Sequence, residues 1–358
     1  RIVVGDITAS NANVSLETPG SVIDADGDDT DNDVTALGLR IDAGKGVGLL
    51  DGNSLGLAVN ALETSVDTLS VWVDGSDGIN ILEADAVTVG DVISPLDGTS
   101  SVTVERVGVD STTTTQTEAI QSDLVTTNTN GDNGSIVLRT EAGSITLTDG
   151  TAPDDGSAVS AHGSGNVLIA AEGAGTSITA QDDADVSSST GHLGLTATLD
   201  VSLQTNVDIT TAGGGTIDVE ATTGSLTMDP TATLQAVDGD IRVTAGDAVA
   251  DQVVVGDVTA SNANVSLETP GSVLDADADD TDNDVTALGL RIDAGKGTGL
   301  LAGNSLTQPV NALETSVDTL SVWVAGSDGI NILEATEVTV GDVISPLDGN
   351  SSVTVERV

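Results

Sequence analysis

The sequence has no cysteine, no phenylalanine and no tyrosine, and only two tryptophans among its 358 residues. Without cysteine the chain has no disulfide, no cysteine nucleophile and no thiolate metal site. Aromatic side chains bury the largest areas in compact cores, so a chain with 1% aromatics must spread its burial over many small aliphatic contacts. Solenoids bury their side chains in this way, because each repeat packs only on its neighbours.

Basic side chains are also scarce, with 9 Lys and Arg residues against 57 Asp and Glu residues and a formal net charge of −48. Such an acidic surface repels phosphate backbones and anionic head groups, so we expect no nucleic-acid partner and no electrostatic docking on membranes. The sequence has no run of 18 apolar residues, which predicts no transmembrane segment. It also does not open with the pattern of a signal peptide. It opens on RIVV, which is typical of a strand interior, so we expect a section of a longer protein.

Disorder is the alternative for so acidic a chain, because charged chains of low hydrophobicity cannot repay the entropy of ordering. Hydrophobic residues nevertheless make up 38% of the sequence, and they recur in short alternating runs. This alternation favours a folded chain built from strands.

An internal repeat organises the chain. Residues 1–107 align without a gap on residues 252–358, at an offset of 251 residues and with 14 differences in 107 positions. We therefore divide the chain into copy one (residues 1–107), an intervening segment (residues 108–251) and copy two (residues 252–358). A repeat of this kind predicts one continuous stack cut from a longer array.

A shorter period runs through the intervening segment. Segments that begin with a glycine or an asparagine and continue as an alternating aliphatic strand start about every 24 residues, at Gly191, Gly215, Gly239 and Asn262. Within one strand, Ile217, Val219 and Ala221 are predicted to point inward, whereas Asp218 and Glu220 face water. The pattern predicts an all-β parallel β-helix, a β-solenoid with coils of about 24 residues that forms a continuous rod.

Tandem immunoglobulin-like sandwiches compete with this interpretation, because the copies are close to 100 residues long. The segment between them has the same strand-and-turn texture and no linker composition, and aromatic core residues are missing. The sequence therefore favours the solenoid.

Several segments resemble known repeats. Three segments resemble the repeats of filamentous-haemagglutinin-like adhesins: GSIVLRTEAGSITLTDG, GTIDVEATTGSLTMD and GDIRVTAGDAV. A fourth segment is similar to repeats of giant bacterial surface proteins: LETSVDTLSVWVDGSDGINILEADAVTVGDV. The resemblance implies a right-handed parallel β-helix that is secreted to the cell surface. It also implies an adhesive or structural role, with other copies of the fibre and cell-surface glycans or proteins as partners. The acidity and the 251-residue period depart from the better-known haemagglutinins.

Two other functions remain open at this stage. A repeating fibre could assemble into a sheath or filament instead of binding a host. Polysaccharide-degrading β-helix enzymes also exist, and they use paired carboxylates. Neither histidine has a catalytic sequence context, no metalloprotease or phosphate-loop motif occurs, and enzymes rarely duplicate so long a segment along one rod. We therefore expect no enzymatic activity.

The acidic loop of each copy is the main candidate site, with six aspartates in ten residues. Crowded carboxylates repel one another, and Ca²⁺ would relieve the repulsion by accepting six to eight oxygen ligands. The first aspartates have the spacing of an EF-hand loop, although that loop's glycine and its final glutamate are missing. The alternative is a solvated corner loop. The candidate ligands are Asp24, Asp26, Asp28, Asp31 and Asp33, and in copy two Asp275, Asp277, Asp279, Asp282 and Asp284.

The two tryptophans, Trp72 and Trp323, occupy the same position in LSVWV of each copy. If Leu69, Val71 and Val73 face the interior, the indole points outward. An outward indole could stack on a sugar or on a neighbouring fibre, so both tryptophans are candidate partner contacts. The alternative is that they pack under an adjacent loop. The rare arginines Arg40, Arg291, Arg106 and Arg357 are expected to pair with carboxylates on adjacent coils.

Overall fold

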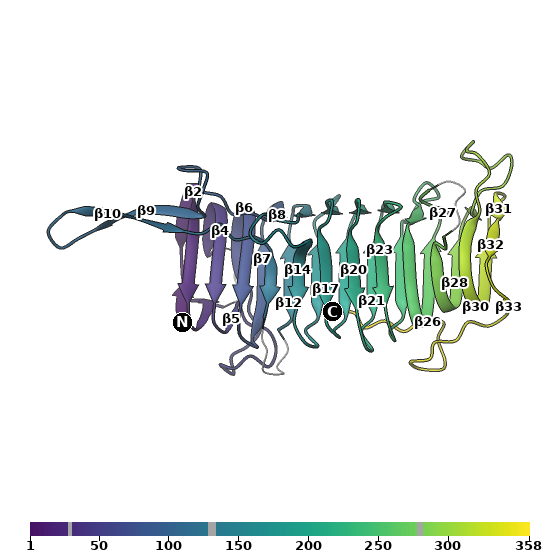
Figure 1. The fold of residues 1–358 in the computed structure, drawn as a ribbon, viewed down its shortest axis with the longest axis horizontal. Helices are drawn as coiled ribbons and strands as arrows, with labels where there is room; N and C mark the ends of the chain where they lie inside the picture. The colour runs from purple at the N-terminus through teal and green to yellow at the C-terminus, as the bar shows by residue number, and fades with distance from the viewer. Residues whose placement is uncertain (28–30, 128–133, 278–281) are drawn as a thin grey trace.

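The computed structural model describes residues 1–27, 31–127, 134–277 and 282–358. In these ranges the chain contains strands, turns and loops but no helix, and thus no helix that could span a membrane. A network of 31 strands forms one sheet whose strand pairs are parallel, and two further strands form an antiparallel hairpin. The predicted all-β class and the parallel stacking are confirmed, and the strands follow one another along an elongated body (Figure 1).

The described part of copy one contains nine strands: β1 (Ile2–Val4), β2 (Ile7–Thr18), β3 (Ser21–Asp24), β4 (Val34–Ala43), β5 (Gly46–Val47), β6 (Leu62–Val73), β7 (Gly78–Glu83), β8 (Val87–Val89) and β9 (Val102–Val107). That of the intervening segment contains fifteen: β10 (Thr113–Glu118), β11 (Leu124–Thr126), β12 (Ile136–Thr140), β13 (Ile145–Leu147), β14 (Ser157–Ala161), β15 (Val167–Ala171), β16 (Ile178–Ala180), β17 (Asp185–Ser188), β18 (Leu193–Ala197), β19 (Val201–Leu203), β20 (Asp208–Thr211), β21 (Ile217–Ala221), β22 (Leu226–Met228), β23 (Thr233–Ala236) and β24 (Ile241–Ala245). That of copy two contains the remaining nine: β25 (Val253–Val255), β26 (Asp257–Thr269), β27 (Ser272–Asp275), β28 (Val285–Ala294), β29 (Gly297–Thr298), β30 (Leu313–Val324), β31 (Gly329–Ile330), β32 (Ile332–Glu334) and β33 (Thr339–Val340).

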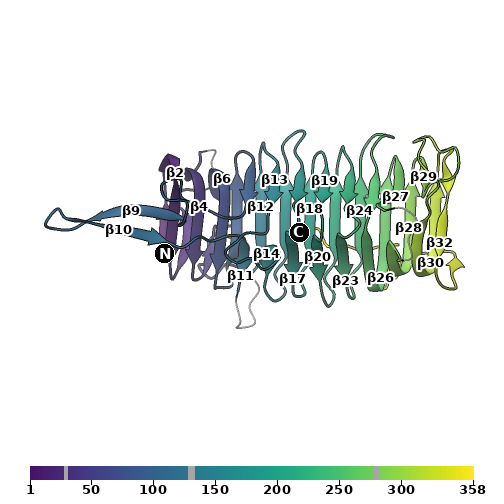
Figure 2. The same cartoon turned by 45° about the horizontal axis from the view of Figure 1, so that its top comes forward.

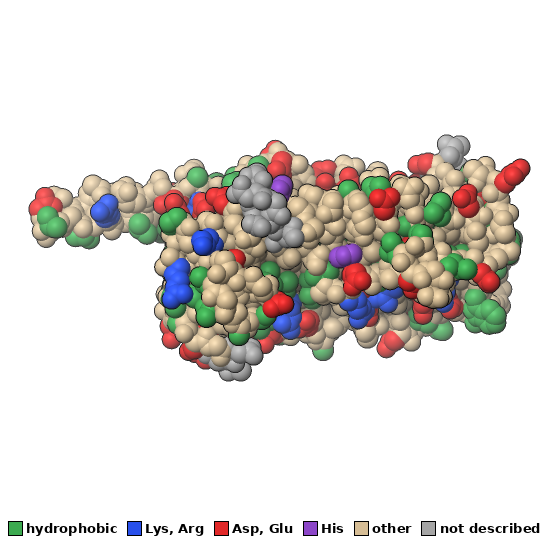
Figure 3. Space-filling model, turned by 90° about the horizontal axis from the view of Figure 1, so that it is seen from below, with side chains coloured by type: hydrophobic (Ala, Val, Ile, Leu, Met, Phe, Trp, Pro, Cys, Tyr) green, Lys and Arg blue, Asp and Glu red, His purple; other side chains and the backbone are tan. Residues whose placement is uncertain are grey.

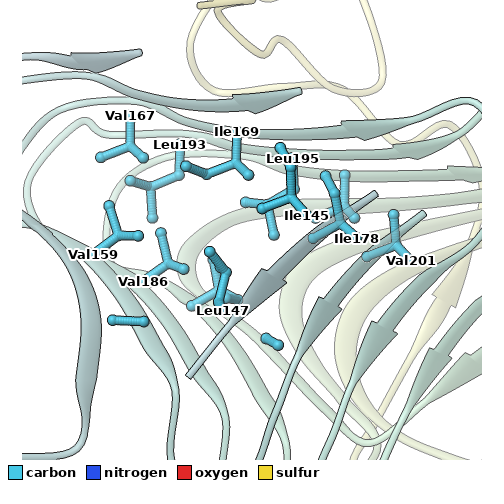
Figure 4. Close-up of a cluster of buried hydrophobic side chains, with 14 of the residues drawn as sticks. Ile145, Leu147, Val159, Val167, Ile169, Ile178, Val186, Leu193, Leu195 and Val201 are labelled. Carbon is cyan, nitrogen blue, oxygen red and sulfur yellow. The ribbon is translucent and has the colours of Figure 1, made fainter. Parts of the chain in front are cut away.

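The core consists of aliphatic rows that run along the stack. Ile217, Val219 and Ala221 are fully buried, as the alternation predicts. Ile217 pairs with Leu193 on one side and with Ile241 on the other, so each side chain packs on its counterparts in the neighbouring coils. Figure 4 shows a part of these rows. Complete burial of one such side chain contributes about 1.5–3 kcal/mol, so many small contacts replace an aromatic core.

One outward position is buried, contrary to the prediction. Asp218 is only 4% exposed, because Arg242 of the next coil donates two hydrogen bonds to its carboxylate, at 2.8 and 2.7 Å. Glu220, two residues on, is half-buried. Ion pairing between coils therefore covers a carboxylate that strand alternation alone assigns to solvent.

Paired residues give the spacing of the coils. Leu193, Ile217, Ile241 and Val265 pair in succession and stand at equal intervals along the chain. The interval is wider elsewhere, as between Leu39 and Leu69, where residues 48–61 form an extra loop. Loops of different length at the corners thus leave the inner rows continuous.

The two copies lie in the same stack, but equivalent strands of the two copies lie on different faces of it, where a face is the sheet formed by one strand of each coil. The row of Val22 continues through β5, β7, β12, β15, β18, β21 and β24 to Val265. Val273, the counterpart of Val22, instead continues the row of Val253 and Leu226. Since each coil from β12 to β23 has three strands, copy two begins one face further round the stack than copy one.

Candidate functional site

The acidic corner of copy one lies where β3 ends and β4 begins. Carboxylate oxygens of Asp24, Asp26 and Asp33 lie within 4.8 Å of one another. Asp24 accepts hydrogen bonds from the backbone N–H of Asp26 at 3.0 Å and from the Asn60 side chain at 2.7 Å. Asp33 accepts the backbone N–H of Glu63 at 3.1 Å. The end of β3, the residue before β4 and the start of β6 therefore meet at one carboxylate cluster.

Copy two builds the same corner from the same residue types. Asn311 donates to Asp275 at 2.7 Å, and the backbone N–H of Glu314 donates to Asp284 at 2.7 Å. Carboxylate oxygens of Asp275, Asp284 and Glu314 lie within 4.8 Å of one another. The chain thus repeats a geometry, as well as a sequence, at this corner.

The structure gathers only some of the predicted ligands. Asp24, Asp26 and Asp33 form the cluster of copy one, but Asp31 is not part of it. In copy two the cluster contains Asp275 and Asp284 but neither Asp277 nor Asp282, and Glu314 joins it. Asp28 and Asp279 lie outside the described residues. Glu314 was missed because it lies 30 residues after Asp284, on the next coil.

Burial and charge set the protonation of these carboxyls. Burial raises the pKa of Asp33 to about 8, and its hydrogen bond with Asp24 acts in the same direction. Burial also acts to raise the pKa of Asp24, but the hydrogen bonds from Asn60 and Asp26 outweigh it and lower the pKa. In copy two, burial and the charge of Asp275 raise the pKa of Asp284 to about 9. At neutral pH each corner holds a proton that a cation would displace.

The two tryptophans have different surroundings. Leu69, Val71 and Val73 are fully buried as predicted, so Trp72 points outward, where its Nε1 donates to the Ser122 carbonyl at 2.9 Å. Trp72 is half-buried against this segment. Trp323 is 69% exposed, because the final residues of β30 pair with β28 on one side but with no strand on the other side among the described residues. A contact with a partner remains a prediction for both.

Arg40 and Arg291 pair between coils, as expected, whereas Arg106 lies on strand β9 of the hairpin. Arg40 lies 3.9 Å from Glu17 on the adjacent coil, and Arg291 lies 3.2 Å from Glu268. Arg139 makes two hydrogen bonds with Glu172, at 2.8 and 2.7 Å. Acidic side chains nevertheless outnumber basic ones along the body (Figure 3).

Asp240 is a buried carboxylate that the sequence did not single out. It is fully buried before β24 and accepts hydrogen bonds from the backbone N–H of Asn264 and of Thr354, both at 2.8 Å, and from the Ser345 hydroxyl. These donors satisfy a charge that would otherwise be costly to bury. Asp240 therefore joins the last coil of the intervening segment to two parts of copy two.

No protein-family model, curated protein or solved structure matches the chain in the comparisons.

Proposed function

We propose that the chain is a section of an extracellular, non-catalytic fibre with a structural and adhesive role, of the filamentous-haemagglutinin-like kind. The proposed fold is a right-handed solenoid with coils of about 24 residues, each of which packs only on its neighbours. The resemblance of its repeats supports the family, and the acidic, cysteine-free composition is compatible with a fibre outside the cell. Partners on this proposal are other copies of the fibre and cell-surface glycans or proteins.

A single observation carries the proposal. Copy two stacks on the coils before it through pairs such as Ile241 with Val265, and it then repeats the register of copy one. Val14 pairs with Leu39 in copy one, and Val265 pairs with Leu290 in copy two. A unit that stacks on its predecessor and buries its residues between coils lengthens a rod without needing a new core. On this proposal, a longer rod carries its outer end further from the cell surface.

The experiment compares the chain with a longer form in which residues 108–358 follow Val358 once more. Each coil adds about 4.8 Å, so the added period should lengthen the rod by on the order of 40 Å in electron micrographs. A string of hinged globules, or an unchanged length, would contradict the proposal. Beads coated with the chain should then adhere to cells or immobilised glycans more than beads coated with an equally acidic control protein.

The two alternatives predict other results. A sheath or filament subunit would form ordered lateral or end-to-end assemblies in the same micrographs and would leave the coated beads non-adherent. An enzyme of the polysaccharide-degrading kind would release reducing sugar from acidic or neutral polysaccharides. The nearly unchanged repetition of copy one as copy two favours the fibre over the enzyme.

We also propose that each acidic corner binds Ca²⁺. In copy one the cluster offers the carboxylates of Asp24, Asp26 and Asp33, which are hard oxygen ligands of the type that Ca²⁺ prefers. In copy two the cluster at the same corner offers the carboxylates of Asp275, Asp284 and Glu314. Bound calcium would replace the proton of the corner and tie the coils together there.

A further inference from the structure

The same seven residues occur at the end of each copy, as residues 101–107 and 352–358, with the sequence SVTVERV. Both segments leave the stack from the same anchor. The Asn13 side chain donates to the Ser101 carbonyl at 2.9 Å, and the Asn264 side chain donates to the Ser352 carbonyl at 2.9 Å. After these equivalent hydrogen bonds, the two segments lie in different surroundings.

The segment of copy two lies along the outer corner of the preceding coils. The backbone N–H of Thr354 donates to Asp240 at 2.8 Å, and that of Glu356 donates to the Thr216 hydroxyl at 3.1 Å. Arg357 then forms ion pairs with Asp218 and Glu220 on the outer face of β21. We call this surface, formed by Asp240, Thr216, Asp218 and Glu220, the acidic corner groove. It holds an extended chain by two backbone donors and one arginine.

The segment of copy one is strand β9, which pairs with β10 in a hairpin that projects beyond β1 and β2 (Figures 1 and 2). Val104 and Val107 are 52% and 67% exposed there, whereas their counterparts Val355 and Val358 are half-buried on the stack. Arg106, the counterpart of Arg357, is exposed. The hairpin thus presents one basic side chain, Arg106, and exposed valines beside the acidic Glu105, Asp110 and Glu118 (Figure 3).

The hairpin leaves the required backbone donors available. Gly108 N–H donates to the Thr112 carbonyl at 2.7 Å, which places residue 108 in a hydrogen-bonded pair. Because hydrogen-bonded pairs alternate along an antiparallel ladder, the N–H groups of Thr103 and Glu105 point away from β10. These are the counterparts of the Thr354 and Glu356 donors that the groove binds. The arm can therefore enter a groove of this kind as an intact hairpin.

We propose that the β9–β10 hairpin is a docking arm that binds the acidic corner groove of a second copy of this chain, with Arg106 placed between Asp218 and Glu220 of that copy. Within one chain the groove is filled by residues 352–358, so the arm of another molecule binds when that segment leaves. Residues 101–107 of the arm have the same sequence as the segment, so the arm offers the groove the same backbone donors and the same arginine. The inference rests on the proposed function, because it names how fibre copies contact one another.

The test first removes the segment that fills the groove and then reverses the charge of Arg106 on the arm. A chain that ends at Ser352 keeps the Asn264 anchor and vacates the groove. In sedimentation experiments the full chain is expected to remain a 35.4 kDa monomer, whereas the shortened chain associates as its concentration rises. Adding Arg106→Glu to the shortened chain should weaken association by at least about tenfold. Arg139→Glu, a charge reversal away from the hairpin, is the matched control and should leave association unchanged.

Two outcomes overturn the proposal: the shortened chain stays monomeric, or it associates equally well with Arg106→Glu. The full-length variant Arg357→Glu repeats the test without truncation, because the reversed charge repels Asp218 and Glu220 and releases the segment. Limited proteolysis should then cut the segment faster than in the parent chain, and unchanged cutting also counts against the groove. Rod length in micrographs of the same samples tests the fibre independently, so the arm can fail while the fibre stands.

Discussion

If Ca²⁺ displaces a proton from each acidic corner, its affinity must depend on pH. Asp33 has a pKa of about 8, so it is about 1% ionised at pH 6 and about 90% ionised at pH 9. Calcium competes with that proton, and its apparent affinity should therefore rise by on the order of 100-fold over this range. Asp284, with a pKa of about 9, should give a similar or larger rise in copy two.

Stability in the absence of calcium should move in the opposite direction. The pKa of Asp33 rises from 3.8 to about 8 on folding, so between these values the folded chain binds more protons than the unfolded chain. Apo stability is therefore greatest below this window and falls as the pH rises through it. Calcium at 100 times its dissociation constant adds about 2.7 kcal/mol, a shift in melting temperature on the order of 5 °C.

The assay is calorimetric titration of calcium at pH 6, 7.5 and 9, with two buffers of different ionisation enthalpy at pH 7.5 to count released protons. Each site should release about one proton at that pH. The double variant Asp33→Asn and Asp284→Asn is the control: it should release none and bind more weakly. An affinity that is constant from pH 6 to pH 9, or a melt that is the same with calcium and with chelator, refutes the proposed exchange.

Other expectations concern the core, the ion pairs and the tryptophans. Leu138→Ala removes a fully buried side chain and should cost about 2–5 kcal/mol in chemical denaturation, whereas Val137→Ala, on the outward face of the same strand, should cost about 0.5 kcal/mol or less. Arg139→Ala breaks an exposed ion pair and should change stability by less than about 1 kcal/mol in the same assay. Iodide should quench Trp323 strongly and Trp72 weakly, as single-tryptophan variants would reveal; equal quenching would contradict the cover that Ser122 gives to Trp72.

The inner rows could be predicted because strand alternation is a local property. Ile217, Val219 and Ala221 are buried for a reason contained in five consecutive residues. Asp218 was wrongly assigned to solvent because its partner, Arg242, lies 24 residues on, in the next coil. A pattern along one strand carries no information on which side chain the next coil places beside it.

The candidate sites show the same limit. Crowding of aspartates pointed to the acidic corner, and Asp24 and Asp33 do meet there. The sequence could not supply the Asn60 donor, which lies 36 residues from Asp24. The buried, hydrogen-bonded position of Asp240 was not predicted, because its donor Thr354 is 114 residues away. Local composition can locate such a cluster, but its hydrogen-bond partners follow from how the coils stack.

The one-face turn between copies bears on how the proposed fibre would contact its surroundings. Val22 and Val273 hold equivalent places in their copies but lie in different rows. Any feature that occurs once per copy, such as the acidic corner or the root of the arm, therefore leaves the rod on a different side in the next copy. Since a coil has three faces, three successive copies would present these features all around the axis. That distribution would allow contacts in every direction, which is consistent with the proposed adhesive fibre and less so with a flat sheath that is bonded along one side.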